Sequence, residues 1–314
     1  MSKYAQEPLS FQALKTVPIQ ARGGKVRVEH FGKPYQGGGV SGLLDALPHI
    51  LAADSFRSVV DALVNARKRK KMILWGLGGH VIKCGLAPIL IDLMNRGYAG
   101  AFAMNGATAI HDFEIAIAGH TSEDVEAVLP DGSFGAAEET GRGINVALEG
   151  GSGFGECLGR HLETHADPRF ACSSLLCAAY QKAAPVTVHV AIGTDTPHTH
   201  PAANGQDLGR ATHHDFRLLC SVVKEIHDGG VYLNVGSAVI LPEVFLKAVS
   251  VVRNLGYPLA DFTTVNFDFL QHYRPKVNVV ERPHARAGGH GYSITGHHEI
   301  MLPLLAAALI ESNA

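Results

Sequence analysis

The sequence is short of several features that mark large classes of proteins. Only 7% of its 314 residues are aromatic, and its five cysteines include no CxxC pair. An odd number of cysteines at such spacings argues against a disulfide framework and predicts a reducing, cytoplasmic compartment. An excess of one charge is also missing, because 27 Lys and Arg face 29 Asp and Glu. The net charge of -2 predicts neither nucleic acid nor an anionic membrane surface as a partner.

Long hydrophobic runs are missing as well. The longest apolar stretch, residues 300–310, contains Pro303 and is too short to span a bilayer. The opening MSKYAQEPLS lacks the apolar core of a signal peptide. A chain of this length buries about three quarters of its extended surface on folding. We therefore expect a globular protein with a large core.

Glycine and histidine are abundant instead. The 35 glycines often directly follow apolar runs, where a residue without a side chain lets the backbone approach a ligand closely. The 18 histidines favour proton-transfer chemistry or a pH-sensitive pocket, although surface exposure alone explains many of them.

Periodicity divides the chain into an N-terminal arm, residues 1–40, and one α/β domain, residues 41–314. Helical spacing over 45–71 ends on the basic cluster RKRKK, which suits the negative end of a helix dipole. Short apolar runs then predict strands over 72–77, 99–105, 185–193, 230–236, 261–267 and 276–280. Helices are predicted over 81–95, 106–118, 156–165, 173–182, 209–227, 242–255 and 299–310, and Thr121, Ser122 and Asp124 offer caps for another. This alternation predicts a mostly parallel sheet with helices on both faces.

Nearly every predicted strand is followed by glycine or a small polar residue. These ends carry Gly78, Gly79 and His80; Asn105, Gly106 and Ala107, then His111 and Asp112; Asp195, then His198 and His200; Gly236 and Ser237; and Thr263, Thr264 and Asp268. In an open α/β sheet, ligands bind beyond the carboxyl ends of the strands, and glycine before a helix N-terminus suits pyrophosphate. The pattern indicates a nucleotide cofactor, with purely structural turns as the alternative because GLGGH is not GxGxxG.

Other chemistries find less support. TDTPHTH, with His189 upstream, allows a metal cluster of His189, His198 and His200. The prolines around it indicate a loop, and we predict no metal there. No cysteine stands where a strand end or helix N-terminus would lower its pKa. A GxSxG elbow is absent, which disfavours an α/β-hydrolase.

The segment GATAIHD, residues 106–112, is similar to a strand-end segment of deoxyhypusine synthase and its relatives. The likeness extends back to Gly78 and forward through GECLGRHLE, PVTVHVAIGTD, LNVGSAVILPEVFLKA, TTVNFD and MLPLLAAAL, and covers residues 70–312. This resemblance implies a Rossmann-like fold, NAD at the strand ends, and a homotetramer with sites at subunit interfaces.

The resemblance also implies roles for individual residues. In that family NAD oxidises spermidine, and a lysine then carries the aminobutyl group as an imine. The cofactor-facing positions fall on Gly78, Gly79, His80, Asn105, Gly106, Ala107, Asp195, Gly236, Ser237, Thr263, Thr264, His297 and His298. The polyamine-binding carboxylates fall on Asp195 and Asp268.

Three positions depart from the family's pattern. Counted without gaps, the imine-forming position falls on His284, and histidine cannot form that imine. The nearest lysine, Lys276, lies on the preceding predicted strand, eight residues out of register. An acidic position of the polyamine pocket falls on His200, and the family's catalytic histidine aligns with Pro242.

These departures favour an NAD-binding enzyme of the same superfamily that acts on a different small molecule, anionic or neutral. Its expected catalytic groups are His111, His200 and His284, and its expected substrate contacts are Asp112, His198 and Asp268. Three alternatives stay open: a true deoxyhypusine or homospermidine synthase using Lys276, a metal-dependent hydrolase, and a nucleotide-binding protein without turnover.

Overall fold

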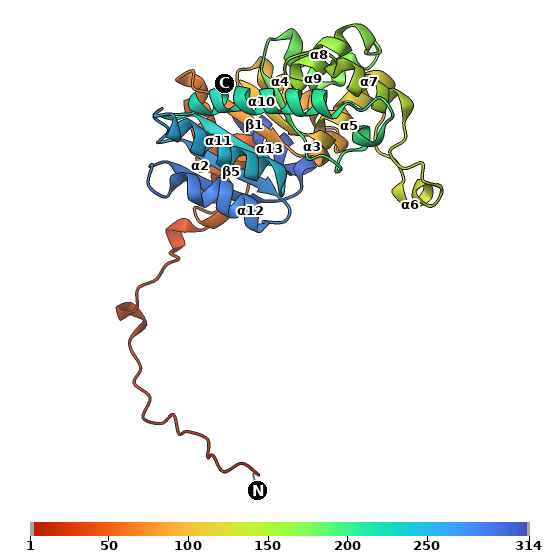
Figure 1. The fold of residues 1–314 in the computed structure, drawn as a ribbon. Helices are drawn as coiled ribbons and strands as arrows, with labels where there is room; N and C mark the ends of the chain where they lie inside the picture. Colours follow the sequence, from red (N-terminus) through yellow and green to blue (C-terminus); the bar gives the residue numbers. More distant parts are fainter. Residues whose placement is uncertain (1–2, 313–314) are drawn as a thin grey trace.

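A six-stranded sheet lies at the centre of the computed structural model, which describes residues 3–312 (Figure 1). Its strand order is β3-β2-β1-β4-β5-β6, and all neighbouring strands are parallel. The strands are β1 Ile73–Leu77, β2 Ala101–Asn105, β3 Val186–His189, β4 Val231–Val235, β5 Thr263–Asp268 and β6 His290–Thr295. The prediction of a parallel α/β sheet is confirmed. The order 3-2-1-4-5-6 is that of dinucleotide-binding Rossmann folds.

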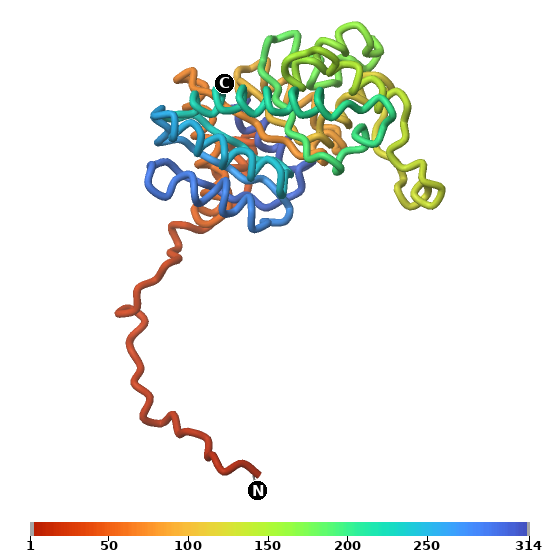
Figure 2. Tube along the Cα trace, in the orientation of Figure 1, coloured from red at the N-terminus to blue at the C-terminus, as the bar shows by residue number. Residues whose placement is uncertain are grey.

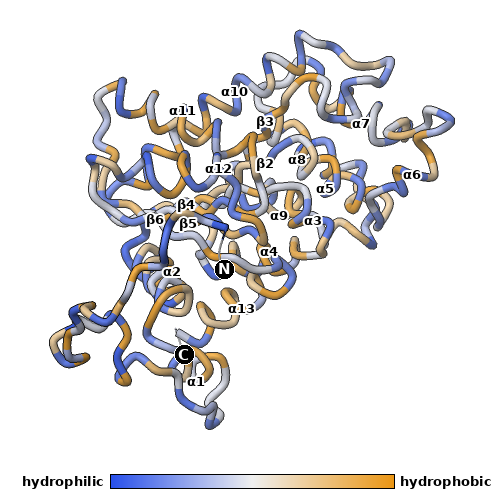
Figure 3. The backbone as a smooth tube through the Cα atoms, turned by 90° about the horizontal axis from the view of Figure 1, so that it is seen from below, coloured by the Kyte–Doolittle hydropathy of each residue, from blue (hydrophilic) through white to orange (hydrophobic). Residues whose placement is uncertain are grey.

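The strands are apolar on both faces because helices cover both. Trp75 and Leu77 of β1 point into one core, whereas Leu74 belongs to the core of the opposite face. The first core also includes side chains from α2, α4, α5, α8, α9 and α13, and the second includes side chains from α10 and α11. Along α10 and α11, hydrophobic and hydrophilic stretches alternate, as one-sided packing requires (Figure 3).

Most predicted helices are present, with shifted ends. Their bounds are α1 Gly39–Ala46, α2 Leu51–Lys68, α3 Gly79–Lys83, α4 Ala87–Asn95, α5 Gly106–Ala118, α6 Val125–Val128, α7 Glu138–Leu148, α8 Phe154–His165, α9 Leu175–Gln181, α10 Gly205–Lys224, α11 Ile240–Asn254, α12 Tyr273–Pro275 and α13 His298–Glu311. The helix predicted over 81–95 is divided at Gly85, whose φ of 74° ends α3. Helix α7 was not predicted, because Gly141 and Gly143 weaken the helical propensity of its sequence.

The strand predicted over 276–280 is wrong. Residues Lys276–Glu281 form a π-helix instead, in which Asn278 and Val279 are buried. The Asn278 amide donates to the carboxylate of Glu243 on α11 over 2.8 Å, so packing against α11 overrides the β-branched composition. The sixth strand is β6, which the hydrophobic pattern missed because Ile294 is its only buried residue.

Most of the N-terminal residues 3–38 extend away from the sheet and its helices (Figure 2), although the His30 carbonyl accepts the His49 N–H and the Lys33 N–H donates to the Ala46 carbonyl. They contain only two short 3-10 turns, Ile19–Ala21 and Val28–His30. The chain joins the folded part at α1, where the backbone N–H groups of Val40 and Ser41 donate to the carboxylate of Glu311 over 3.1 and 2.8 Å. The division into an arm and a single domain at residue 40 stays a prediction.

Within residues 3–312, no helix is both long and apolar enough to cross a membrane.

Candidate functional site

The carboxyl ends of the strands form one edge of the sheet. The register places Leu77 of β1 beside Met104 of β2 on one side and Val235 of β4 on the other. Gly78, Gly106 and Gly236 therefore follow their strands at a common edge. The chain order reverses between β1 and β4, and ligands of open α/β sheets bind at such a switch point.

Two glycines let the backbone segments after β1 and β4 pack closely at this switch point. The Gly78 N–H donates to the Val235 carbonyl over 2.8 Å. A Cβ on Gly78 would lie 2.1 Å from the Gly236 carbonyl oxygen, so no other residue fits without moving the backbone. Gly236 has a φ of 69°, in the left-handed region that favours glycine.

Helix α5 begins at the same edge, directly after β2. The Asn105 side chain caps it by accepting the Thr108 N–H over 2.9 Å. In dinucleotide-binding Rossmann folds, an Asp or Glu about 20 residues after the glycine-rich turn binds the ribose. Here β2 ends in an amide, and that amide is occupied by the helix cap. A ribose at this edge would need another partner.

His111, on the second turn of α5, lies against the glycine turn after β1. A Cβ on Gly79 would lie 3.2 Å from the His111 ring. His111 Nδ1 lies 2.7 Å from the Thr121 hydroxyl, which donates to one oxygen of Glu114. The Thr140 hydroxyl donates to the other oxygen over 2.9 Å.

This chain of hydrogen bonds fixes the tautomer of His111. Because the single proton of the Thr121 hydroxyl goes to Glu114, the hydroxyl accepts from His111 Nδ1–H. The neutral ring therefore leaves Nε2 without a proton. Burial lowers the pKa of His111, which keeps this form at neutral pH. An imidazole with one nitrogen oriented and the other free is the arrangement of a general base.

Sequence reasoning found none of these hydrogen-bond partners beyond His111 itself. Thr121, Ser122 and Asp124 were predicted as caps. Asp124 does cap α6 by accepting the Ala127 N–H, whereas Thr121 hydrogen-bonds to His111. Glu114 lies three residues after His111, and that spacing on a helix was the one available signal.

Asp195 and His198 form a second polar group at this edge. His198 Nε2 lies 3.9 Å from Asp195 Oδ2, and neither atom has a hydrogen-bond partner although both are buried. The Gly193 N–H donates to His198 Nδ1, so the neutral ring carries its proton on Nε2. Both residues line a cavity of about 10 Å³ with Gly106. Burial raises the pKa of Asp195 to about 6 and lowers the pKa of His198.

A third group lies where β4 and β5 end. His298, the first residue of α13, is fully buried, and its Nε2 lies 3.9 Å from Asp268 Oδ1. A Cβ on Gly236 would lie 2.7 Å from the same nitrogen. Ser237 accepts the Leu241 N–H over 3.2 Å near the start of α11. His297, the next residue towards the strand, is exposed.

Unpartnered polar atoms concentrate at this edge. Seven buried side-chain N or O atoms of the described residues lack a partner, and four of them belong to Asp195, His198, Asn234 and His298. Each such atom costs about 1–3 kcal/mol. Their concentration along the carboxyl edge indicates a site built for a polar ligand.

Three predicted residues lie at the opposite edge. Thr263 and Thr264 begin β5 and pair with Val231 and Tyr232 at the start of β4. His284 Nε2 lies 2.7 Å from the Thr264 hydroxyl. At about 3.3 Å per residue, four residues of strand separate them from the carboxyl edge by about 13 Å. The structure thus places the expected cofactor contacts Thr263 and Thr264 and the expected catalytic group His284 away from the carboxyl edge, because the apolar run over 261–267 did not reveal where β5 begins.

Two further predicted residues have structural partners. His200 Nε2 lies 3.0 Å from the Glu138 carboxylate, and its Nδ1 accepts the Ala202 N–H. Asp112 is fully buried beneath α9, where its two oxygens accept from the Ser174 hydroxyl and the N–H groups of Leu175 and Leu176. These partners leave neither side chain free to contact a substrate.

We expect Asp112→Asn to destabilise the protein without changing its ligand binding. One oxygen would still accept from α9, but the new amide nitrogen would face a donor, at a cost of about 1–2 kcal/mol. Urea unfolding, followed by the fluorescence of the single buried Trp75, measures the loss. Asp61→Asn on the exposed face of α2 is the control. Unchanged unfolding of the Asp112 variant would contradict this structural role.

The histidine set considered for a metal does not assemble. His189 is buried and bonds Thr187 over 2.9 Å, and burial lowers its pKa to about 4. Among residues 3–312, His189, His198 and His200 do not form a group of three converging donors. The alternative of a metal-dependent hydrolase that uses these three histidines therefore finds no support in their arrangement.

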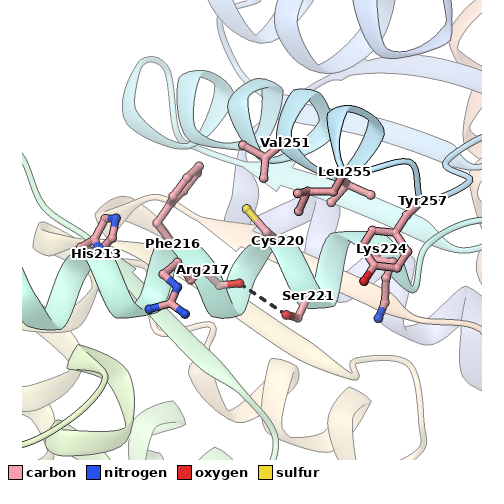
Figure 4. A pocket seen from close by; sticks show the side chains of 10 residues that line it. His213, Phe216, Arg217, Cys220, Ser221, Lys224, Val251, Leu255 and Tyr257 are labelled. Atoms are coloured by element: carbon pink, nitrogen blue, oxygen red, sulfur yellow. Dashed lines mark hydrogen bonds between the residues drawn. The ribbon is translucent and has the colours of Figure 1, made fainter.

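A larger hollow lies elsewhere. A groove of about 370 Å³ runs between α10 and α11, where Phe216, Cys220 and Leu255 line it and Lys224 lies over the Tyr257 ring (Figure 4). These helix ends lead into β4 and β5 at the amino edge of the sheet. No predicted site residue lines this groove.

Solved structures with the same fold are known. A protein from Methanococcus maripaludis S2 described as LOR/SDH matches with a TM-score of 0.54 and 15% identity, over 84% of this chain and 71% of its own. AgrE in a ternary complex with ornithine and NAD+ matches with a TM-score of 0.52 and 14% identity, over 82% of this chain and 33% of AgrE. This chain thus spans about one third of AgrE.

A protein from Entamoeba histolytica described as a deoxyhypusine synthase matches with a TM-score of 0.50 and 10% identity, over 88% of this chain and 94% of its own. No family model matches the chain, and neither does any curated protein sequence. At such identities these likenesses establish the fold alone.

Proposed function

We propose that this protein is an NAD-dependent enzyme that oxidises a small molecule, with His111 as its general base. The observation that carries the proposal is the free Nε2 of His111 beside the glycine turn at the switch point. The NAD+ complex of AgrE, about one third of which matches this fold, supports the choice of cofactor.

The residues at the carboxyl edge suit a dinucleotide. The Gly78–Gly236 contact leaves no room for a side chain between β1 and β4, so a ligand at this edge would meet only backbone there. The N–H groups that begin α5 follow Gly106 and favour an anion. We assign cofactor contacts to Gly78, Gly79, His80, Gly106, Ala107, Gly236, Ser237, His297 and His298.

The chemistry needs one proton acceptor. NAD, when bound, would supply the hydride acceptor for a substrate carbon that carries an amine or a hydroxyl group. His111 Nε2 takes the proton that this heteroatom loses, and Glu114, acting through Thr121, stabilises the resulting imidazolium. Asp195 and His198 offer a carboxylate and an N–H to the rest of the substrate, with Asp268 beyond them.

The transfer of an aminobutyl group finds less support. Lys276 is exposed on the π-helix, and His284 lies near the amino edge. A synthase of the deoxyhypusine type would need a lysine at the carboxyl edge. We propose a homo-oligomer, as the resemblance implies, without assigning its interface.

Calorimetric titration with NAD tests the cofactor. We expect binding, and we expect Gly106→Ala to weaken it about tenfold, or about 1.4 kcal/mol. The added Cβ would lie 2.1 Å from Asp195 Oδ2 and push that carboxylate into the site. Gly209→Ala is the matched control, because a Cβ there meets nothing within 4 Å. The absence of both binding heat and a thermal shift at millimolar NAD would overturn the proposal.

A further inference from the structure

One group of metal-binding side chains lies outside the set considered above. His80 on α3, Cys84 at the end of α3 and Glu299 on α13 place an imidazole nitrogen, a thiol sulfur and a carboxylate oxygen within 4.8 Å of one another. Cys84 Sγ lies 3.7 Å from Glu299 Oε2. His80 and Cys84 are four residues apart, so one helical turn points them the same way.

The geometry points to a zinc site formed by His80, Cys84 and Glu299, and we propose that this protein binds Zn²⁺ there. Tetrahedral zinc has bonds of about 2.0–2.3 Å to nitrogen, oxygen and sulfur, which puts its ligand atoms about 3.5 Å apart. The present separations need only small side-chain rotations to reach that value. A thiolate with an imidazole selects zinc over calcium or magnesium.

The partners around the cluster agree with a cation. His297 Nδ1 lies 3.8 Å from Glu299 Oε1, which puts a second imidazole beside the group. The described ion pairs give Glu299 no lysine or arginine. On binding, zinc would replace the Cys84 thiol proton, which passes to solvent, and the Cys84–Glu299 hydrogen bond would give way to two metal–ligand bonds.

The site would lie at the carboxyl edge of the sheet, beside the switch point. His80 directly follows Gly78 and Gly79, and Glu299 directly follows His298, which contacts Gly236. Three protein ligands leave a fourth position open to water or to an oxygen of a ligand, as in catalytic rather than structural zinc sites. The inference does not depend on NAD, and a chain that fails to bind NAD leaves it intact.

Metal titration of the full-length chain, stripped with a chelator, tests the inference. We expect one Zn²⁺ per chain by calorimetry. Co²⁺ in its place should give the absorption of a thiolate-bound, tetrahedral ion. Cys84→Ser should abolish that absorption and weaken Zn²⁺ binding by more than the 10–100-fold that loss of an outer-shell partner costs. Glu299→Gln should weaken binding and keep the thiolate absorption.

Cys172→Ser is the control, because Cys172 is exposed on a different segment and should leave binding unchanged. A second readout does not depend on the variants. Zn²⁺ should protect Cys84, but not Cys172, from alkylation, as measured by peptide mass spectrometry. Absence of zinc binding, or binding and cobalt absorption that survive Cys84→Ser, would overturn the proposal.

Discussion

Replacing His111 by glutamine should lower turnover about 10²–10⁴-fold, the range that general acid–base catalysis contributes. Glutamine keeps a polar side chain beside Gly79 but cannot accept the proton that the substrate loses. Affinity for NAD should change little, because His111 is not among the residues assigned as cofactor contacts. The loss should therefore appear in kcat.

The measurement follows NADH formation with the compounds that respond in a screen of small amines, amino acids and hydroxy acids. Ornithine belongs in that screen because AgrE binds it together with NAD+. His120→Gln is the matched control, since His120 is exposed at the end of the same segment. Full activity of the His111 variant would refute its role as the base.

The pH dependence separates His111 from a merely structural histidine. Burial lowers its pKa, and the Glu114 carboxylate acts in the opposite direction. The base works when neutral, so activity should rise with pH through the lowered pKa, and its acidic limb should lie below pH 6.5. Glu114→Gln removes the raising influence and should move that limb to still lower pH. A limb that stays in place would show that Glu114 does not act through His111.

The sequence was sufficient to predict the sheet because buried parallel strands are apolar along their whole length. Strands β1 and β2 each follow such a run and end where glycine or asparagine begins a helix. The edge strand β6 has one buried residue and therefore no such run. The π-helix was wrongly predicted as a strand for the opposite reason. Val277, Val279 and Val280 are typical of strands, and only contact with α11 decides their conformation.

Some features of the candidate site could be predicted from the sequence, and others could not. The glycines that follow strands were predictable, because a glycine directly after a strand allows close backbone packing at the edge of the sheet. The Gly78–Gly236 contact is an example. The placement of Thr264 and His284 was not predictable, because a run of apolar residues does not tell which end of a strand a hydroxyl occupies. Thr121 joins His111 and Glu114 from the loop after their helix, and no spacing rule anticipates that contact; only the three-residue spacing of His111 and Glu114 was visible in the sequence.

At neutral pH the protein should be less stable with the carboxyl group of Asp195 than with an amide at that position. Burial raises its pKa from 3.8 to about 6 in the folded state, so the folded chain holds this proton more tightly than the unfolded chain. The free energy of unfolding should therefore fall as pH rises from about 4 to 6 and stay lower above that. The shift corresponds to about 3 kcal/mol.

Asp195→Asn should remove this cost. We expect the variant to be more stable than the parent chain by about 3 kcal/mol at pH 8 and to match it near pH 4, in urea unfolding followed by Trp75 fluorescence. Asp131→Asn is a control of opposite sign, because hydrogen bonds from Ser133 lower the pKa of that exposed carboxyl group. It should not stabilise the chain at neutral pH.

The same Asp195→Asn substitution separates a functional carboxylate from a structural one. Asp112 accepts three hydrogen bonds, and its loss should destabilise the fold, whereas Asp195 Oδ2 is buried without a partner. A protein retains such an unfavourable group where activity needs it. Asp195→Asn should thus gain stability and lose turnover in the NADH assay. If the variant is less stable than the parent chain at pH 8, Asp195 stabilises the fold. The proposal that Asp195 contacts the substrate would then be refuted.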